Sequence, residues 1–336
     1  MKTQNLSLEF NHFPVMLSEI IKLSSPINGG IFVDCTLGGG GYSNALLQFP
    51  KTKVIGIDRD QAAQSVAYKL KKKFQSRFKF YQIKFSEIGT VLKDNVDTVI
   101  FDLGLSSIQL KDLKRGFSFK SKEKLDMDMG LSKFSAQEVI NNLNEKQLGL
   151  IIKTLGEEKD ATKIAKNIVK ARSKRKITRV DELVEIIERS KKRNISSKIN
   201  PSTKTFQALR IFVNKEITEL INGIISAAKI LKPGGKIVIV SFHSIEDKIV
   251  KFFFSNFSKN RSKPSRYIPD DNFENLALFE NYNKKIIKPS QKEIKINNPS
   301  RSAKLRFAIR TKNKFIFPSS MYQKFDRYLK IEALNV

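Results

Sequence analysis

Short apolar runs alternate with amphipathic segments through the first hundred residues of the chain. Each apolar run has the length of a buried strand, and each amphipathic segment has the spacing of a helix that covers a sheet. A series of strand, helix and strand builds a parallel sheet. The predicted strands are 30–33, 53–58 and 96–101, and the predicted helices are 15–23, 43–47 and 61–73.

A further strand of the same type lies far beyond the third, at residues 236–241. It follows a helical pattern at 214–231 and a Pro-Gly-Gly turn. A crossover between parallel strands needs only about a dozen residues, so most of 107–205 is expected to be an insertion. Helical periodicity marks residues 136–155, 162–171 and 180–187 of that insertion, and a final strand is expected at 303–310.

These patterns predict an α/β fold, a Rossmann-like sheet with an inserted helical domain. We expect residues 1–108 and 206–317 to form the sheet domain, 109–205 the helical insertion, and 318–336 a C-terminal tail. The stretch 255–295 is polar and basic with interspersed aromatic residues, which predicts a long irregular segment. Its rings either stack on bases or dock the segment onto the domain.

The charge of the chain is strongly positive, because Lys and Arg number 62 against 33 Asp and Glu, a formal net charge of +29. Such a field attracts phosphate polyanions, so the composition favours a nucleic-acid partner over a mere enrichment of lysine on solvated surfaces. The insertion contributes two basic runs, at 170–176 and 191–193. They either face RNA or are solvated helix faces.

The single cysteine, Cys35, excludes an internal disulfide, and no cluster of Cys and His offers a structural zinc site. We therefore expect no metal. Residues 1–13 lack the apolar core of a secretion signal, and the apolar runs elsewhere are too short to cross a bilayer. The expected location is the cytoplasm, without membrane association.

A glycine-rich turn is the most informative local motif. Asp34 ends the first strand, and four glycines, Gly38 to Gly41, open the next helix. The spacing of the acid and the glycines suits S-adenosylmethionine, whereas a pyrophosphate-binding turn needs a further glycine where Ser43 stands. Asp58 ends the second strand, where its carboxylate can accept hydrogen bonds from ribose hydroxyls.

Polar side chains also follow two later strands at the same edge of the predicted sheet, where ligands of open α/β sheets bind. Asp102 ends one strand and leads into Ser106, Ser107 and Gln109, while His243 follows another strand directly. Asp102 either serves a cofactor or orients a substrate, and the two serines are candidates to face substrate. His243 is either a substrate contact or a structural hydrogen-bonding residue.

The chain resembles ribosomal RNA small-subunit methyltransferase H, the MraW family, in blocks that follow the family's order over nearly its whole length. Such a set is far more specific than any single glycine motif. The blocks are His12 to Leu17, the glycine turn, Ile57 to Asp60, Asp102 to Gln109, Arg115 to Phe119, Leu125 to Met127, Leu209 to Asn214, Ser241 to Asp247, Asn298-Pro299 and Arg301 to Arg306.

The resemblance implies methylation of the exocyclic N4 of a cytidine in the decoding region of 16S rRNA, within the small ribosomal subunit. It also implies S-adenosylmethionine as the cofactor and a class I methyltransferase fold whose helical insertion recognises substrate. The family's cofactor contacts correspond to Gly40, Gly41, Tyr42, Asp58, Phe85, Asp102 and Gln109. Ser107 and His243 remain the candidates for substrate-facing, catalytic positions.

Two departures from the family pattern bear on activity. The family usually has His where this chain has Tyr42, and its Leu-Asp-Met-Arg-Met-Asp pattern reads Leu125-Asp-Met-Asp-Met-Gly130 here. One rival hypothesis is therefore a non-catalytic ribosome-assembly factor that binds rRNA and retains cofactor binding. A second is a nucleotide-dependent oxidoreductase, against which the missing glycine argues.

Overall fold

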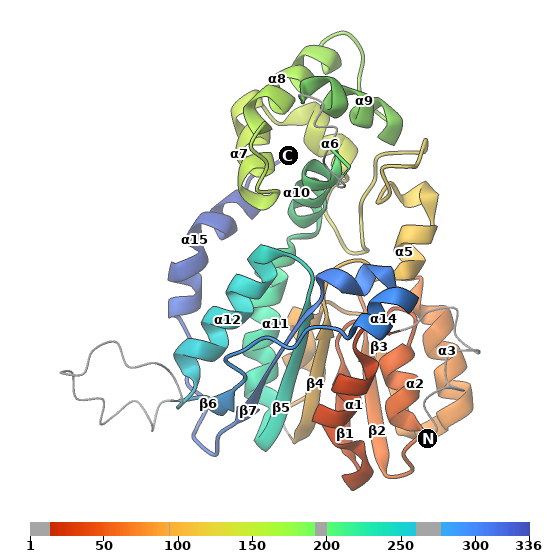
Figure 1. Cartoon of the computed structure of the whole chain (residues 1–336), viewed down its shortest axis with the longest axis vertical. Coiled ribbons are helices and arrows are strands. Elements are labelled where there is room, and N and C mark those ends of the chain that lie inside the picture. The colour runs from red at the N-terminus through yellow and green to blue at the C-terminus, as the bar shows by residue number, and fades with distance from the viewer. Residues whose placement is uncertain (1–13, 94, 192–199, 260–276) are drawn as a thin grey trace, which may run out of the picture. The chain divides into compact units, whose positions relative to one another are not determined.

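The computed structural model describes residues 14–93, 95–191, 200–259 and 277–336 (Figure 1). The chain divides into two compact units, each described here by itself. The sheet unit comprises Met1–Gly104 and Glu219–Met321, and the helical unit comprises Leu105–Thr218 and Tyr322–Val336.

The sheet unit is built on seven strands in the order β3-β2-β1-β4-β5-β7-β6. The first five in this order are parallel, while β7 runs antiparallel to β5 and to β6. This is the Rossmann-like sheet that the patterns predict and the class I methyltransferase fold that the resemblance implies. The strands are β1 (Gly30–Asp34), β2 (Thr52–Ile57), β3 (Phe78–Tyr81), β4 (Val96–Asp102), β5 (Leu231–Ser241), β6 (Phe279–Tyr282) and β7 (Lys304–Arg310).

The central strands are apolar on both faces because helices cover both. On one face, Phe32, Val54, Ile100 and Val238 pack in one buried cluster with the helices α1 (Leu17–Ser24), α2 (Gly41–Leu47) and α3 (Ala63–Phe74). The alternate positions face α11 (Glu216–Ile230) and α12 (Ser244–Phe257), where the rings of Phe85 and Phe101 meet edge to face. The short elements are η1 (Pro26–Asn28), η2 (Gln75–Arg77), η3 (Phe85–Glu87), α4 (Ile88–Val91), α14 (Gln291–Ile296) and η5 (Asn298–Ser302).

The helical unit has its own apolar core, in which α7 packs against both α8 and α10, and α8 also packs against α9. Apolar side chains at helical spacing, such as Ile164 and Ile168, are fully buried. None of the helices in the described part of the chain is long and apolar enough to cross a membrane. The elements are α5 (Ser107–Lys111), η4 (Leu113–Arg115), α6 (Ala136–Asn142), α7 (Glu145–Leu155), α8 (Ala161–Arg172), α9 (Val180–Ser190), α10 (Thr203–Asn214) and α15 (Ser320–Glu332), which starts in the sheet unit.

The secondary structure corrects the sequence prediction in several places. The stretch 255–295 is not irregular throughout: α12 continues to Phe257, β6 lies within the stretch, and α14 begins in it. Strand β3 and helix α10 have no counterpart in the prediction, and the tail at 318–336 contains α15. His12, the end of the basic run at 191–193 and residues 260–276 lie outside the described residues.

Candidate active site

Three aspartates end neighbouring parallel strands of the sheet unit. Asp34 closes β1, Asp102 closes β4, and Asp58 directly follows β2. Since β1 pairs with both β2 and β4, the three carboxyl ends meet at one edge of the sheet. This edge is where open α/β sheets bind their ligands.

The glycine turn is attached to this edge through its backbone. The Gly38 amide donates to Asp58 Oδ2 at 2.8 Å, and the Asp60 amide donates to Asp58 Oδ1 at 2.9 Å. Gly38 and Gly40 have φ angles of +46° and +74°, which side chains with a Cβ rarely adopt. Asp58, the candidate ribose acceptor, is therefore held by one hydrogen bond from the turn and one from the backbone that follows β2.

The start of α2 leaves no room for side chains at its glycines. A Cβ on Gly40 would lie 2.7 Å from Val66 Cγ1, and one on Gly41 would lie 2.2 Å from Pro14 Cγ. Both distances are far below a normal van der Waals contact. Gly40 and Gly41 are thus required by close packing around the turn.

Tyr42, which directly follows the four glycines, is buried, with 4% of its surface exposed. Its hydroxyl lies 2.5 Å from the Val15 carbonyl oxygen and 3.2 Å from Asp102 Oδ2. The other carboxyl oxygen of Asp102, Oδ1, is buried and has no hydrogen-bond partner among the described residues. Buried polar atoms are rarely left unpaired, so Asp102 Oδ1 is an acceptor available to a ligand.

Two further hydrogen bonds fix the same edge. Ser43 Oγ donates to Asp34 Oδ2 at 2.7 Å, and the Asp102 amide donates to Thr36 Oγ1 at 2.8 Å. Together they tie the ends of β1 and β4 and the first turn of α2 into one rigid arrangement. Such support preorganises the carboxyl groups before a ligand arrives.

All three aspartates hold their protons unusually strongly. Burial raises the pKa of Asp34 to about 6, although hydrogen bonds from Ser43 and Thr36 lower it. Burial likewise raises the pKa of Asp58 to about 6. Burial raises the pKa of Asp102 to about 8; the Tyr42 hydrogen bond lowers it, and the negative charges of Asp34, Glu246 and Glu293 raise it further. A bound cation would favour the ionised forms.

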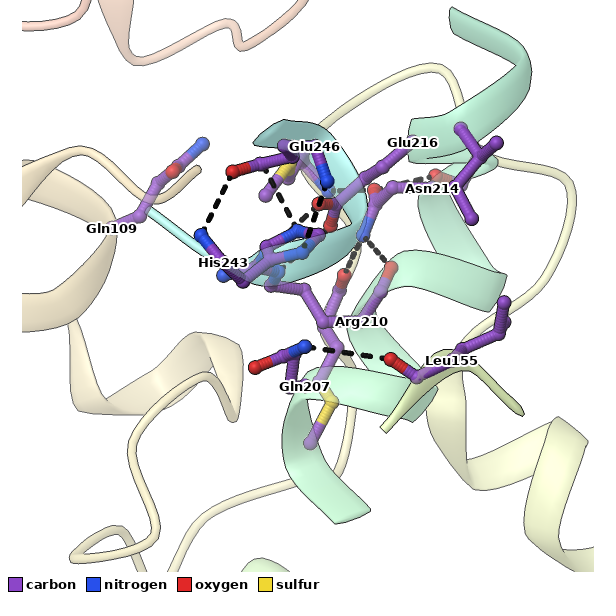
Figure 2. A network of polar contacts seen from close by, with 12 residues as sticks. Gln109, Leu155, Gln207, Arg210, Asn214, Glu216, His243 and Glu246 are labelled. Carbon is purple, nitrogen blue, oxygen red and sulfur yellow. Dashed lines mark hydrogen bonds and ion pairs between the residues drawn. The ribbon is translucent and has the colours of Figure 1, made fainter. Parts of the chain in front are cut away.

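His243 is the N-cap of α12. Its Nδ1 accepts from the Glu246 amide at 3.5 Å, and its Nε2 lies 3.1 Å from Glu246 Oε1 (Figure 2). In return, the Glu246 carboxylate accepts from the amides of Phe242 and His243. This capping box gives His243 a structural role, and its contact with substrate stays a prediction.

The remaining predicted site residues lie in both units. Phe85 packs edge-on against Phe101, one residue before Asp102, in the sheet unit. Gln109 and Ser107 belong to the helical unit, where Gln109 forms a capping box with Ser106 at the start of α5. The side chain of Ser107 lies outside the described part of the structure, so its substrate contact stays a prediction. The cofactor contact of Gln109 also stays a prediction.

The divergent loop at residues 125–130 is firmly held within the helical unit. The buried Asn214 amide group donates to the Met127 carbonyl and accepts from the Met129 amide, both at 2.8 Å (Figure 2). Asp128 Oδ1 accepts from the amides of Gly130 and Ser132. In this chain Asp128 therefore organises the loop's own turn.

Sequence reasoning missed several groups around the aspartates: Thr36 and Ser43, which bond to the ends of β4 and β1, the Val15 carbonyl, which bonds to Tyr42, and Glu293, whose charge acts on Asp102. Glu293 Oε1 accepts from the Met16 amide at 2.7 Å, across 277 positions of the chain. No local signal predicts a contact at that separation. Thr36 and Ser43 lie inside the glycine motif, and their short polar side chains are the signal that could have identified them.

Comparison with known proteins identifies the family to which this chain belongs. The profile of the MraW methylase family matches residues 9–311. The chain belongs to this family. Curated relatives are named ribosomal RNA small subunit methyltransferase H: the Ehrlichia ruminantium (strain Welgevonden) protein is 44% identical over 88% of this chain and 98% of its own length. Those of Bartonella grahamii and Rickettsia akari are 42% and 41% identical, over 89% and 88% of this chain and 90% and 97% of their own lengths.

Solved structures resemble this MraW-family chain more distantly. An rRNA methylase from Streptococcus thermophilus aligns with 87% of this chain and 96% of its own, at 10% identity and a TM-score of 0.39. An MraW methylase uses S-adenosylmethionine as its methyl donor.

The edge of the sheet fits that cofactor. A sulfonium and an amino group are cationic, and within the described residues none of the three aspartates has a cationic partner. Asp58 retains lone pairs for ribose hydroxyls, and Asp102 Oδ1 is an unpaired acceptor. The glycine turn would let the backbone approach the cofactor without intervening side chains.

We expect cofactor affinity to rise with pH in this protein. In the free site Asp102, whose pKa is about 8, is mostly protonated at pH 6, whereas a cationic ligand favours its ionised form. Binding then releases a proton, so affinity should increase about tenfold or more from pH 6 to pH 8. Calorimetric titration over this range measures it.

Asp102→Asn is the control, because it keeps the shape of the side chain and removes its proton equilibrium. Any pH dependence that the variant retains belongs to the ligand or to other groups. An affinity that rises equally in both proteins would contradict the assignment to Asp102.

Proposed function

We propose that this protein transfers a methyl group from S-adenosylmethionine to the exocyclic N4 of a cytidine in the decoding region of 16S rRNA. As a member of its family, the chain is a methyltransferase of small-subunit ribosomal RNA. The observation that supports the finer proposal is the unpaired, buried Asp102 Oδ1 at the cofactor edge, because a base amino group is a hydrogen-bond donor that such an oxygen can accept.

The protein's part in the reaction is mainly positioning. The cofactor supplies an activated methyl group on a cationic sulfur, whereas the cytosine amino group is a weak nucleophile because its lone pair is delocalised. Asp102 Oδ1 would accept a hydrogen bond from that amino group and, when ionised, take its proton after transfer. Holding two reactants in register can contribute several kcal/mol to catalysis.

Catalysis is favoured over a purely structural role in ribosome assembly. The two departures from the family pattern leave the site intact: Tyr42 fills a buried position beside Asp102, and Asp128 stabilises its own loop. The three strand-end aspartates and the glycine turn are all in place. The site is thus equipped both to bind cofactor and to orient an amine.

A row of lysines on α8 is the candidate contact for the rRNA backbone. Residues 161–176 contain seven basic residues and no acidic one. Lys163, Lys166, Lys170 and Lys174 are exposed: the first three lie on α8 opposite its buried face, and Lys174 lies in the turn just after the helix ends at Arg172. None of the four has an ion-pair partner among the described residues. The three lysines on α8 stand about 5 to 6 Å apart along the helix axis, so they can contact phosphates together.

Replacing these four lysines with Gln should weaken binding to 16S rRNA and flatten its salt dependence. Loss of four phosphate contacts should reduce the slope of log affinity against log salt by about 3, because each contact releases a counterion. Filter binding between 50 and 200 mM salt measures the slope. The matched control replaces four exposed lysines of the sheet unit, Lys69, Lys71, Lys72 and Lys79. An equal loss of rRNA affinity in both variants would mean that positive charge anywhere on the protein supports binding, and that these lysines form no defined contact surface.

The function is tested by incubating the protein with labelled S-adenosylmethionine and small ribosomal subunits from cells that lack this gene. We expect label in 16S rRNA, and none when the subunits come from cells that carry the gene, because the position is already methylated. Cofactor binding without transfer to either subunits or free rRNA would support the assembly-factor alternative.

A further inference from the structure

Tyr42 stands where the family usually has His, and its surroundings indicate a specific task. The side chain is buried, and its hydroxyl lies within hydrogen-bond distance of two acceptor oxygens, the Val15 carbonyl and Asp102 Oδ2. A tyrosine hydroxyl has one proton and can donate fully to only one of them. The protonation state of Asp102 decides which of the two oxygens accepts the hydrogen bond from the Tyr42 hydroxyl.

The Tyr42 hydroxyl can form a hydrogen bond with Asp102 whether Asp102 is protonated or ionised. When Asp102 is protonated, its Oδ2–H donates to the Tyr42 oxygen, and Tyr42 donates to the Val15 carbonyl at 2.5 Å. When Asp102 is ionised, the Tyr42 hydroxyl donates its hydrogen bond to Oδ2 instead. In both states Oδ2 is engaged by Tyr42, and Oδ1, which has no partner among the described residues, is the oxygen left for a ligand.

We propose that Tyr42 is a positioning residue for methyl transfer: by holding Asp102 Oδ2 it presents Oδ1 to the amino group that is methylated. This inference rests on the proposed function. The charged groups that act on Asp102 are Asp34, Glu246 and Glu293, which all disfavour its ionisation, while the Tyr42 hydrogen bond favours it. Tyr42 itself stays neutral, because burial and the negative charge of Asp102 raise its pKa well above the usual value.

Tyr42→Phe removes the hydroxyl and keeps the ring. We expect kcat for methyl transfer to fall about tenfold, with little change in KM for the rRNA substrate, since orientation of one group is lost. Because the Tyr42 hydrogen bond lowers the pKa of Asp102, the acidic limb of the kcat profile should also move to higher pH. Tyr68→Phe, at an exposed position of α3, is the matched control and should match the parent protein.

A merely structural Tyr42 predicts a different pattern. If Tyr42→Phe lowers thermal stability and kcat but leaves the pH profile unmoved, or leaves both kcat and profile unchanged, the proposal is wrong. Tyr42→His, which restores a polar group, should recover part of kcat. If the parent protein itself transfers no methyl group to small subunits, the proposed function fails instead, which separates the two results.

Discussion

Asp102→Asn should lower methyl transfer by at least about a hundredfold, the scale of losing a positioned proton acceptor. The amide has the same shape, yet its NH₂ group donates where a carboxylate would accept, and it cannot take the proton of the amino group. Cofactor affinity should fall less, because Asp34 and Asp58 still supply negative charge at the edge of the sheet. Single-turnover transfer to small subunits and calorimetric cofactor binding separate the two effects.

Asp326→Asn is the control for this experiment, because Asp326 lies on the exposed side of α15 in a surface pair with Lys330. It should change neither turnover nor cofactor binding. An Asp102→Asn protein with unchanged turnover and unchanged cofactor affinity would remove Asp102 from the mechanism.

Gly40→Ala should disrupt the cofactor turn. The position has φ +74°, which costs an L-residue about 1 to 2 kcal/mol, and the new Cβ would lie 2.7 Å from Val66 Cγ1. Overpacking adds about 1 to 3 kcal/mol, so we expect a clear drop in stability and a loss of cofactor affinity of tenfold or more. Denaturant unfolding and calorimetric titration measure the two quantities.

Gly234→Ala separates backbone strain from crowding. Gly234 has a similar φ of +78°, but a Cβ there meets nothing within 4 Å. This variant should be mildly destabilised with normal cofactor binding. Adding Val66→Ala to Gly40→Ala should relieve the clash and restore part of the affinity. Equal cofactor affinity in the two glycine variants would count against the close-packed turn.

The parts of the site that the sequence predicts are those with local signals. The glycine turn, Asp58 and Asp102 each directly follow or end an apolar strand, and strand ends of a parallel sheet meet at one edge. The central strands and the helical insertion are predicted for the same reason, since their hydrophobic periodicity extends over enough residues to identify each element.

The missed features depend on tertiary context. Strand β3 has only four residues, and its register beside β2, not its own pattern, makes it a strand. The contact of Glu293 with Met16 joins segments 277 positions apart. That Tyr42 turns inward to Asp102 depends on packing around Val15, which no motif encodes.

The central claim is most directly tested by locating the methyl group. After reaction of the protein with small subunits that lack the modification, 16S rRNA is digested and the labelled nucleotide is identified by mass spectrometry. The account predicts N4-methylcytidine at one position of the decoding region, and its near absence with Asp102→Asn. Label on another base, or on a different atom of the cytidine, would contradict it.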